Sequence, residues 1–326
     1  MNSQIEKFRK LVLLGTWRLA ILGTLEYIRR KIYSRLNINT YIQSKLLVGG
    51  PAGPIHAFHV LIFRYIFKQE QDGLNIMDKD WDNLIILDSY RADYFRKHSC
   101  ISGKLSTFTS KGTWSLEFIV NNFQNFEFHD TVVVTSNPYY QRYSKLGEGT
   151  FHSIIYCPNT GGIKSFDKLS KKALETNEEF PNKRIIIHYM KPHTPHIGET
   201  SEKLRNKFGD AYPGMFLLYR SGVISKGTLE QSYIDTIDMI EPKVQKVLKE
   251  LDGKSVVSAD HGENLGEKRH GLTQVGHGNP TQECYRVPWL ETEYTERRRI
   301  RTDPPVESTL IDEEIVEENL RALGYM

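Results

Sequence analysis

The pattern of hydrophobic and polar residues changes near residue 75. Residues 1–75 have a helical pattern, with a break at the glycine and proline cluster over 49–54 that no helix continues through. From Asn83 onward, short apolar runs are separated by polar turns. We therefore expect a helical N-terminal extension over 1–75 and a separate main domain over 76–326.

Five of the short apolar runs have the character of buried strands. They are rich in Ile and Val and do not alternate with polar residues, which is typical of strands covered on both faces of a sheet. The runs lie at 83–87, 131–135, 152–156, 184–188 and 254–259.

Amphipathic segments lie between these runs. Residues 164–176 and 231–251 carry apolar residues at three- and four-residue spacing, as helices do. Pro242 should start a second helix there or kink the first. The alternation predicts an α/β fold, with a mostly parallel central sheet between helices and ligands beyond the carboxyl ends of the strands. A surface connection over 294–308 and a short helix over 312–323 should follow.

The charge is mild overall but uneven along the chain. The net charge of +3 and the pI near 8.5 give no reason to expect a nucleic-acid partner. Residues 1–36 nevertheless carry eight Lys or Arg. Within them, Arg18 and Glu26 interrupt the apolar stretch 11–28, which is too short to be a membrane span of roughly 20 residues. Peripheral membrane contact through an amphipathic helix and packing on the main domain both stay open.

The three cysteines are widely spaced. Cys100, Cys157 and Cys284 are odd in number and form no CxxC pair, which argues against a disulfide framework. We therefore expect a reducing compartment, with the protein in the cytoplasm or at the inner face of the membrane.

Candidate metal ligands follow two of the predicted strands directly. Asp88 comes after 83–87, and Asp260 and His261 come after 254–259. Because the carboxyl ends of parallel strands lie along one edge, these residues should converge although they are about 170 positions apart. Carboxylate and imidazole ligands suit Zn²⁺ or Mn²⁺ first, with Ca²⁺ or Mg²⁺ as alternatives. The simpler alternative for Asp88 is a helix cap.

Several segments together resemble the sulfatase and alkaline phosphatase-like superfamily. They are NLIILDSYRADYF from residue 83, KPHTPH from 191, SADHGENLGEKRHG from 258, GHGNPTQECYRVPWL from 276 and the ending LRALGYM. The resemblance covers residues 83–326 and implies the superfamily's α/β fold. It also implies that Asp88, Asp260 and His261 hold a metal, and that a strand follows in the VP segment.

The resemblance also implies a nucleophile at the start of a helix. SKGTWSLEFIVNNF, from residue 110, offers two hydroxyls there. Thr113 has a spacing similar to the threonine nucleophiles of lipoteichoic-acid synthase-like members, whereas Ser115 matches the register of a start in which Trp precedes Thr or Ser. We prefer Thr113 slightly. Both residue types are also ordinary helix caps.

The remaining roles come from the same resemblance. His193 and His277 should contact the transferred group or protonate the leaving oxygen, with His270 as second choice. Arg91 and Asp93 should form a structural pair beside the site. None of the three cysteines lies in a CxPSR-like context, so formylglycine chemistry is not expected.

The sequence therefore predicts a metal-dependent hydrolase or transferase of phosphate or sulfate esters, acting on a glycan or a lipid head group. The alternative is a degenerate relative that binds such an anion without turnover.

Overall fold

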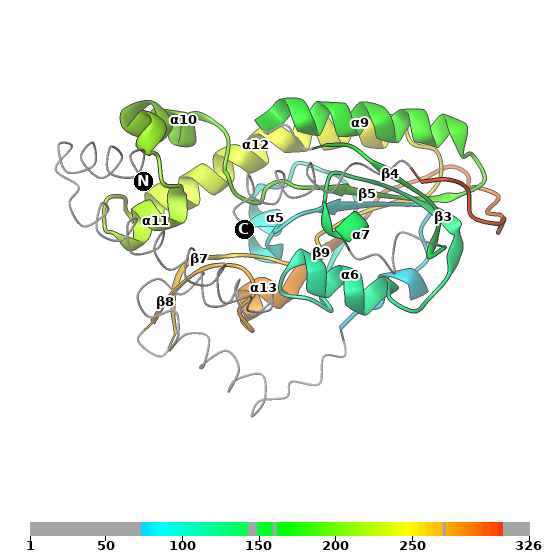
Figure 1. Cartoon of the computed structure of the whole chain (residues 1–326), viewed down its shortest axis with the longest axis horizontal. Helices are drawn as coiled ribbons and strands as arrows, with labels where there is room; N and C mark the ends of the chain where they lie inside the picture. Colours follow the sequence, from blue (N-terminus) through cyan, green and yellow to red (C-terminus); the bar gives the residue numbers. More distant parts are fainter. Residues whose placement is uncertain (1–72, 143–148, 159–161, 270–271, 309–326) are drawn as a thin grey trace. The chain divides into compact units, whose positions relative to one another are not determined.

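The structure is a computed structural model that describes residues 73–142, 149–158, 162–269 and 272–308 (Figure 1). Nearly all of the predicted extension over 1–75, and the predicted helix over 312–323, lie outside the described residues. The described residues form two compact units. We call 195–235 and 264–280 the hairpin unit, and the other described residues the sheet unit.

A seven-stranded sheet is the centre of the sheet unit. Its order is β2-β9-β6-β1-β5-β3-β4. The five strands from β6 to β4 are parallel, β9 runs antiparallel to β6, and β2 runs antiparallel to β9. The strands are β1 (Asn83–Leu87), β2 (Lys104–Thr109), β3 (Phe128–Thr135), β4 (Phe151–Tyr156), β5 (Arg184–Tyr189), β6 (Ser255–Ser258) and β9 (Arg286–Glu291).

This topology confirms the predicted fold class. The five apolar runs are the five parallel strands, and they hold the core. Ile85 of β1 pairs with Ile187 of β5, and both side chains are fully buried. The helices of the sheet unit are α5 (Ala92–His98), α6 (Ser115–Phe123), α7 (Tyr139–Arg142), α9 (Gly162–Glu179) and α13 (Gln282–Tyr285), with a 3-10 turn, η2 (Ile76–Asp78).

Helices cover both faces of the sheet. In Figure 1, α9 lies on one face, and α6 and α13 lie on the other. The sheet-unit part of α12 (Lys226–Glu250) shares the face of α9, where Lys243 pairs with Asp167 at 2.6 Å. Because α12 runs through Pro242 without ending, no second helix starts there, and the predicted alternative of a kink at Pro242 stays a prediction.

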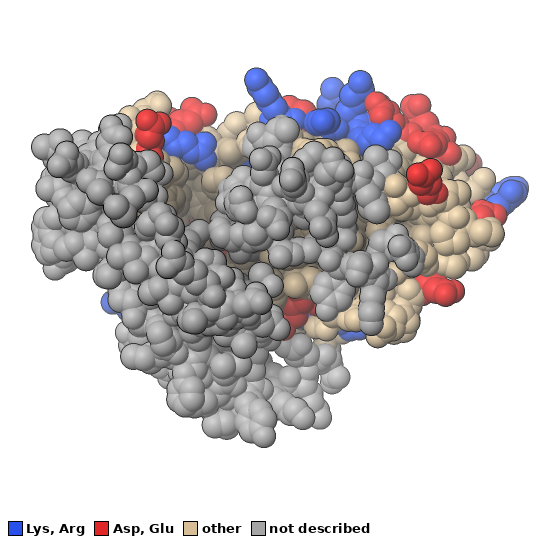
Figure 2. Space-filling view, viewed as in Figure 1, with Lys and Arg blue, Asp and Glu red and all other residues tan. Residues whose placement is uncertain are grey.

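The outer face of α9 is a solvated charged surface. Figure 2 shows basic and acidic side chains side by side along it. Glu175 lies 3.7 Å from Lys171 and 3.2 Å from Lys172. The mixture of signs is that of an ordinary exposed helix.

The hairpin unit contains short helices and one β-hairpin. Its elements are α10 (Glu199–Phe208), η3 (Gly209–Ala211), α11 (Met215–Arg220), the first turns of α12, β7 (Asn264–Arg269) and β8 (Leu272–Gly276). The buried ring of His196 lies in this unit, with Nδ1 2.7 Å from the hydroxyl of Ser232.

Residues 292–308 form an extended segment, here called the strap, that runs past the amino ends of the strands. Arg297 binds Asp82, just before β1, at 2.7 Å. Lys183, just before β5, binds Asp303 at 2.7 Å, and the N–H of Val306 donates to the carbonyl of His152 in β4 at 2.8 Å. The predicted surface connection is therefore held to the sheet by specific contacts.

Among the described helices, none combines the length and the apolar character that a bilayer span requires.

Candidate active site

The predicted metal ligands converge at the carboxyl edge of the sheet. Asp88 follows β1, and Asp260 and His261 follow β6, the strand next to it. One ligand atom from each lies within 4.8 Å of the others, and all three side chains are fully buried. The expected convergence of these distant residues is confirmed.

Backbone and hydroxyl groups orient the two carboxylates. Oδ1 of Asp260 accepts hydrogen bonds from the N–H groups of Ser89, at 3.2 Å, and His261, at 2.9 Å. The Ser89 hydroxyl donates to Oδ1 of Asp88 at 2.9 Å. Ser89 has a φ of 67°, a left-handed conformation that is strained for a residue other than glycine. In this strained conformation, the N–H of Ser89 is placed to donate to Oδ1 of Asp260.

The pKa values of the two carboxyl groups are shifted in opposite directions. Burial raises the pKa of Asp88 well above its ordinary value, and the charge of Asp260 adds to the effect. Burial also acts to raise the pKa of Asp260, but His261, His188 and Ser115 outweigh it and hold that pKa well below the usual range. Two buried carboxylates and an imidazole that face one another fit a divalent cation, which would neutralise both acids.

Ser115 lies among these three ligands. It is the first residue of α6 and is fully buried. Its hydroxyl donates to Oδ2 of Asp260 at 2.7 Å, and lies 3.5 Å from both Oδ2 of Asp88 and Nε2 of His261. The first turn of a helix also presents N–H groups that have no partner within the helix, which suits an anionic group.

The hydroxyl of Thr113 points to a different partner. It donates to Oε2 of Glu117 at 2.9 Å, and the Thr113 N–H donates to the same oxygen at 2.8 Å. A Glu in the first turn that accepts hydrogen bonds from residues just before the helix is a common way to stabilise a helix N-terminus. Of the two predicted nucleophiles, Ser115 is the better placed, which reverses the slight preference for Thr113.

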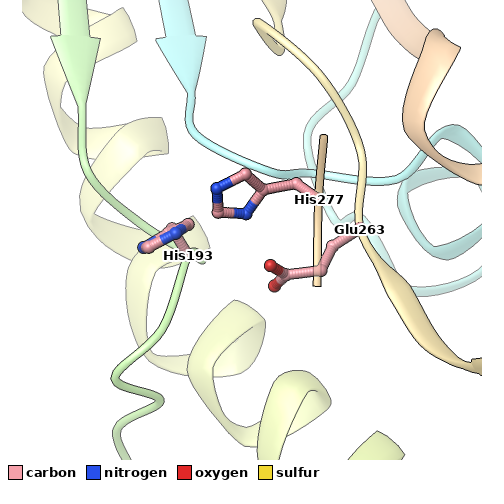
Figure 3. Close-up of side chains that lie close together, drawn as sticks. All are labelled: His193, Glu263 and His277. Atoms are coloured by element: carbon pink, nitrogen blue, oxygen red, sulfur yellow. The ribbon is translucent and has the colours of Figure 1, made fainter. Parts of the chain in front are cut away.

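His193 and Glu263 form a second group beside the ligands. In Figure 3 their side chains face a common space. The His193 N–H donates to the carbonyl of Asp88 at 3.0 Å, and Nζ of Lys191 donates to the His193 carbonyl at 2.9 Å. Burial raises the pKa of Glu263 to about 8, against the opposing charges of His261, Lys191 and Arg91.

The other predicted residues have varied outcomes. Arg91 and Asp93 form the expected pair, at 2.9 and 2.7 Å, and Arg91 also donates to the carbonyl of Glu263 at 3.2 Å. His277, also drawn in Figure 3, belongs to the hairpin unit, and its role stays a prediction. His270 lies outside the described residues.

Sequence reasoning did not assign a role to Glu263 or Tyr140, and it placed His188 in the core or in support of the predicted ligands. Glu263 carried a usable signal, because it lies two residues after His261 in the same polar segment. His188 ends a predicted strand but looks like a core residue. Tyr140 gave no signal, since nothing in its local sequence connects it to distant ligands.

Comparison with solved structures gives distant similarities. One is the soluble domain of lipooligosaccharide phosphoethanolamine transferase A from Neisseria meningitidis, with 15% identity, 65% of this chain and 76% of that chain covered, and a TM-score of 0.40. Another is the periplasmic domain of EcEptC from Escherichia coli in complex with Zn, with 14% identity, 68% and 75% covered, and a TM-score of 0.41. A third is the C-terminal periplasmic domain of phosphoethanolamine transferase EptC from Campylobacter jejuni, with 14% identity, 64% and 78% covered, and a TM-score of 0.37.

These proteins are members of the alkaline phosphatase and sulfatase-like superfamily, the group that the sequence motifs resemble. No protein-family model matches the sequence, and the comparison with curated proteins gives no match either.

Proposed function

We propose that this protein is a metal-dependent enzyme that transfers or hydrolyses a phosphate ester through a covalent phosphoserine on Ser115. One observation carries the proposal: the Ser115 hydroxyl lies 2.7 Å from Asp260 and within 3.5 Å of Asp88 and His261, at the start of α6. A hydroxyl placed among three metal-ligand candidates is the arrangement that activates a nucleophile.

The residues divide the work as follows. Asp88, Asp260 and His261 would hold the cation, which when bound lowers the pKa of the serine hydroxyl and offsets charge on the phosphoryl oxygens. Asp260 accepts the hydrogen bond of Ser115 and so orients its oxygen. The first turn of α6 offers N–H donors to the phosphoryl oxygens.

The proposed reaction has two halves. In the first, the Ser115 hydroxyl loses its proton to water, a bond forms between Oγ and phosphorus, and the bond to the leaving oxygen breaks while His193 or His277 gives that oxygen a proton. In the second half, an alcohol or water gives its proton to that histidine and bonds to phosphorus while the bond to Oγ of Ser115 breaks, and Ser115 regains a proton from water. Glu263 beside His193 offers a carboxyl group that can hold the imidazole in place.

We propose a phosphate ester of a lipid head group or glycan as the substrate. The lack of a formylglycine motif disfavours sulfate. The similar structures are named as phosphoethanolamine transferases, which supports testing such head groups first. The metal would be Zn²⁺ or Mn²⁺, and one similar structure is named as a complex with Zn.

The location and the membrane contact stay predictions. Cys100, Cys157 and Cys284 are free thiols, which agrees with a reducing compartment. Against that, two of the similar structures are named as periplasmic domains. The basic arm over 1–36 lies outside the described residues.

The test is a matched pair of variants. Ser115→Ala should lower kcat by roughly 10⁴-fold or more on a generic phosphodiester or a phosphoethanolamine lipid with Zn²⁺ or Mn²⁺, because it removes the nucleophile. Thr113→Ala removes the hydroxyl that donates to Glu117 and should keep most of the activity. Mass spectrometry of quenched wild-type reactions should find phosphate on Ser115.

Full activity in Ser115→Ala would reject the assignment. A wild-type protein that binds the anion but never forms phosphoserine or product would favour the alternative of a binding protein without turnover.

A further inference from the structure

His188 lies between two buried partners in the sheet unit. It belongs to β5, the neighbour of β1, and its side chain is fully buried. Its Nδ1 is 3.2 Å from the hydroxyl of Tyr140, and its Nε2 is 3.4 Å from Oδ2 of Asp260. We propose that Tyr140 and His188 form a positioning pair that fixes the carboxylate of Asp260 toward Ser115 and the cation.

One arrangement of protons satisfies both contacts of the ring, with Tyr140 as donor to Nδ1 and Asp260 as acceptor from Nε2. Burial raises the pKa of Tyr140 well above its ordinary value, and the charge of Asp260 adds to this, so the phenol keeps its proton. A phenol that donates to Nδ1 makes that nitrogen the acceptor in a neutral imidazole. The ring proton is then on Nε2, the nitrogen that faces Asp260.

Neighbouring rings hold the imidazole in this orientation. Phe118 of α6 packs edge-to-face against it at 6.2 Å and 81°, and the ring of Tyr140 does so at 5.6 Å and 88°. Among the described residues, Nε2 has no hydrogen-bond partner within normal range. Asp260 is therefore the acceptor that is at hand for the Nε2 proton.

The contact of His188 with Asp260 matters because the two carboxylate oxygens of Asp260 have different partners. Its Oδ1 accepts two backbone N–H groups, and its Oδ2 receives the hydroxyl of Ser115. A donor behind Oδ2 limits rotation of the carboxylate. Loss of such a supporting contact commonly lowers metal affinity or activity by about 10- to 100-fold. The inference rests on the proposed function of the Asp88, Asp260 and His261 site.

The test uses two amides that reach different ring positions. In His188→Gln the amide reaches the place of Nε2 and can donate to Asp260, whereas in His188→Asn it reaches only the place of Nδ1. Affinity for Mn²⁺ is measured by calorimetry on the full chain. We expect His188→Gln to bind within about 3-fold of wild type, and His188→Asn to lose about 10- to 100-fold.

Two further measurements separate positioning from folding. Thermal unfolding in EDTA should give similar Tm values for the two amide variants, so that a difference in Mn²⁺ affinity belongs to the site. Nitrogen-15 NMR of the metal-free wild type should show the proton of His188 on Nε2. Tyr140→Phe, which removes the donor to Nδ1, should weaken that preference.

The outcomes distinguish this inference from the proposed function. If wild type binds Mn²⁺ and Asp260→Asn does not, but the two His188 amides bind equally well, the positioning pair is wrong and the site stands. If wild type binds no metal at all, the proposed function fails, and the NMR tautomer still decides the pair. A proton on Nδ1 of His188 overturns the inference in either case.

Discussion

Gly262 separates His261 from Glu263 and has no room for a side chain. Its N–H donates to the carbonyl of Cys284 at 2.8 Å. A Cβ at this position would overlap the carbonyl oxygen of Glu283 and lie 3.3 Å from Cγ of Arg91. The close approach fixes the backbone that carries His261, so the site depends on the smallest residue within it.

Gly262→Ala should therefore damage both the fold and the site. Because backbone and not a flexible side chain is in the way, we expect a loss of about 1–3 kcal/mol in the free energy of unfolding. Urea unfolding measures this loss, and calorimetry should show weaker Mn²⁺ binding.

The control is Gly227→Ala on the exposed face of α12, where the nearest neighbour is Oγ of Ser225 at 3.7 Å. That change should be neutral or stabilise by about 0.4–1 kcal/mol. Equal effects of the two substitutions would contradict the argument.

The sequence located the proposed ligands more clearly than it located the proposed nucleophile. Asp88, Asp260 and His261 directly follow apolar runs, so the edge of the sheet that they occupy could be inferred. The choice between Thr113 and Ser115 depends on the residue at which α6 begins, and both residue types are common at helix starts. Gly112 packs against the backbone at Phe118, a tertiary contact that local sequence does not express.

At the scale of elements, the strap is attached to the sheet through Asp82. Oδ2 of this buried carboxylate accepts from Nε of Arg297 at 2.7 Å and from the N–H of Lys254 at 2.7 Å. Oδ1 accepts from Nη2 of Arg297 at 3.0 Å. Burial acts to raise the pKa of Asp82, but Arg297 and the N–H donors of Lys254 and Arg298 outweigh it, so the pKa is lowered from 3.8.

This shift makes the contribution of Asp82 dependent on pH. A lowered pKa means that the folded state favours the ionised acid, so its stabilisation is present above pH 3.8 and is lost as pH falls through the folded pKa. Asp82→Asn should cost about 2 kcal/mol at pH 7. In urea unfolding, the difference in the free energy of unfolding between Asp82→Asn and wild type should shrink at pH 3.

The control is Asp78→Asn, at an exposed position nearby, which should change stability little. A difference for Asp82→Asn that is the same at both pH values would contradict this role.

The strands also differ in how clearly the sequence pattern predicts them. The five parallel strands are buried apolar runs, and their pattern alone identifies them. Strand β2 has the sequence KLSTFT with alternating exposure at the edge of the sheet, and its partner β9 is about 180 residues away. The pairing of β2 with β9 depends on this distant contact, and composition does not reveal it. The strands of the hairpin unit, β7 and β8, are largely polar, so no apolar run predicts them.

At the scale of the whole molecule, cation binding should add to stability. The sheet unit holds Asp88 and Asp260 fully buried and close together, which is unfavourable without a counter-charge. At 100 times the Kd, a cation that binds only the folded state adds about 2.7 kcal/mol. Zn²⁺ or Mn²⁺ should therefore raise the Tm in differential scanning fluorimetry, and EDTA should reverse the rise. Asp260→Asn should abolish the response. An unchanged Tm in wild type at saturating metal would count against the site.

The position of β6 has a consequence for the order of events during synthesis. Asp260 and His261 leave the ribosome about 170 residues after Asp88, and β6 must pair with β1 before these residues meet. A nascent chain therefore has no complete set of ion ligands until β6 and the two residues after it have been translated. Metallation would be a late step in maturation, and a chain truncated before residue 255 could not compete for the cell's zinc or manganese through this site.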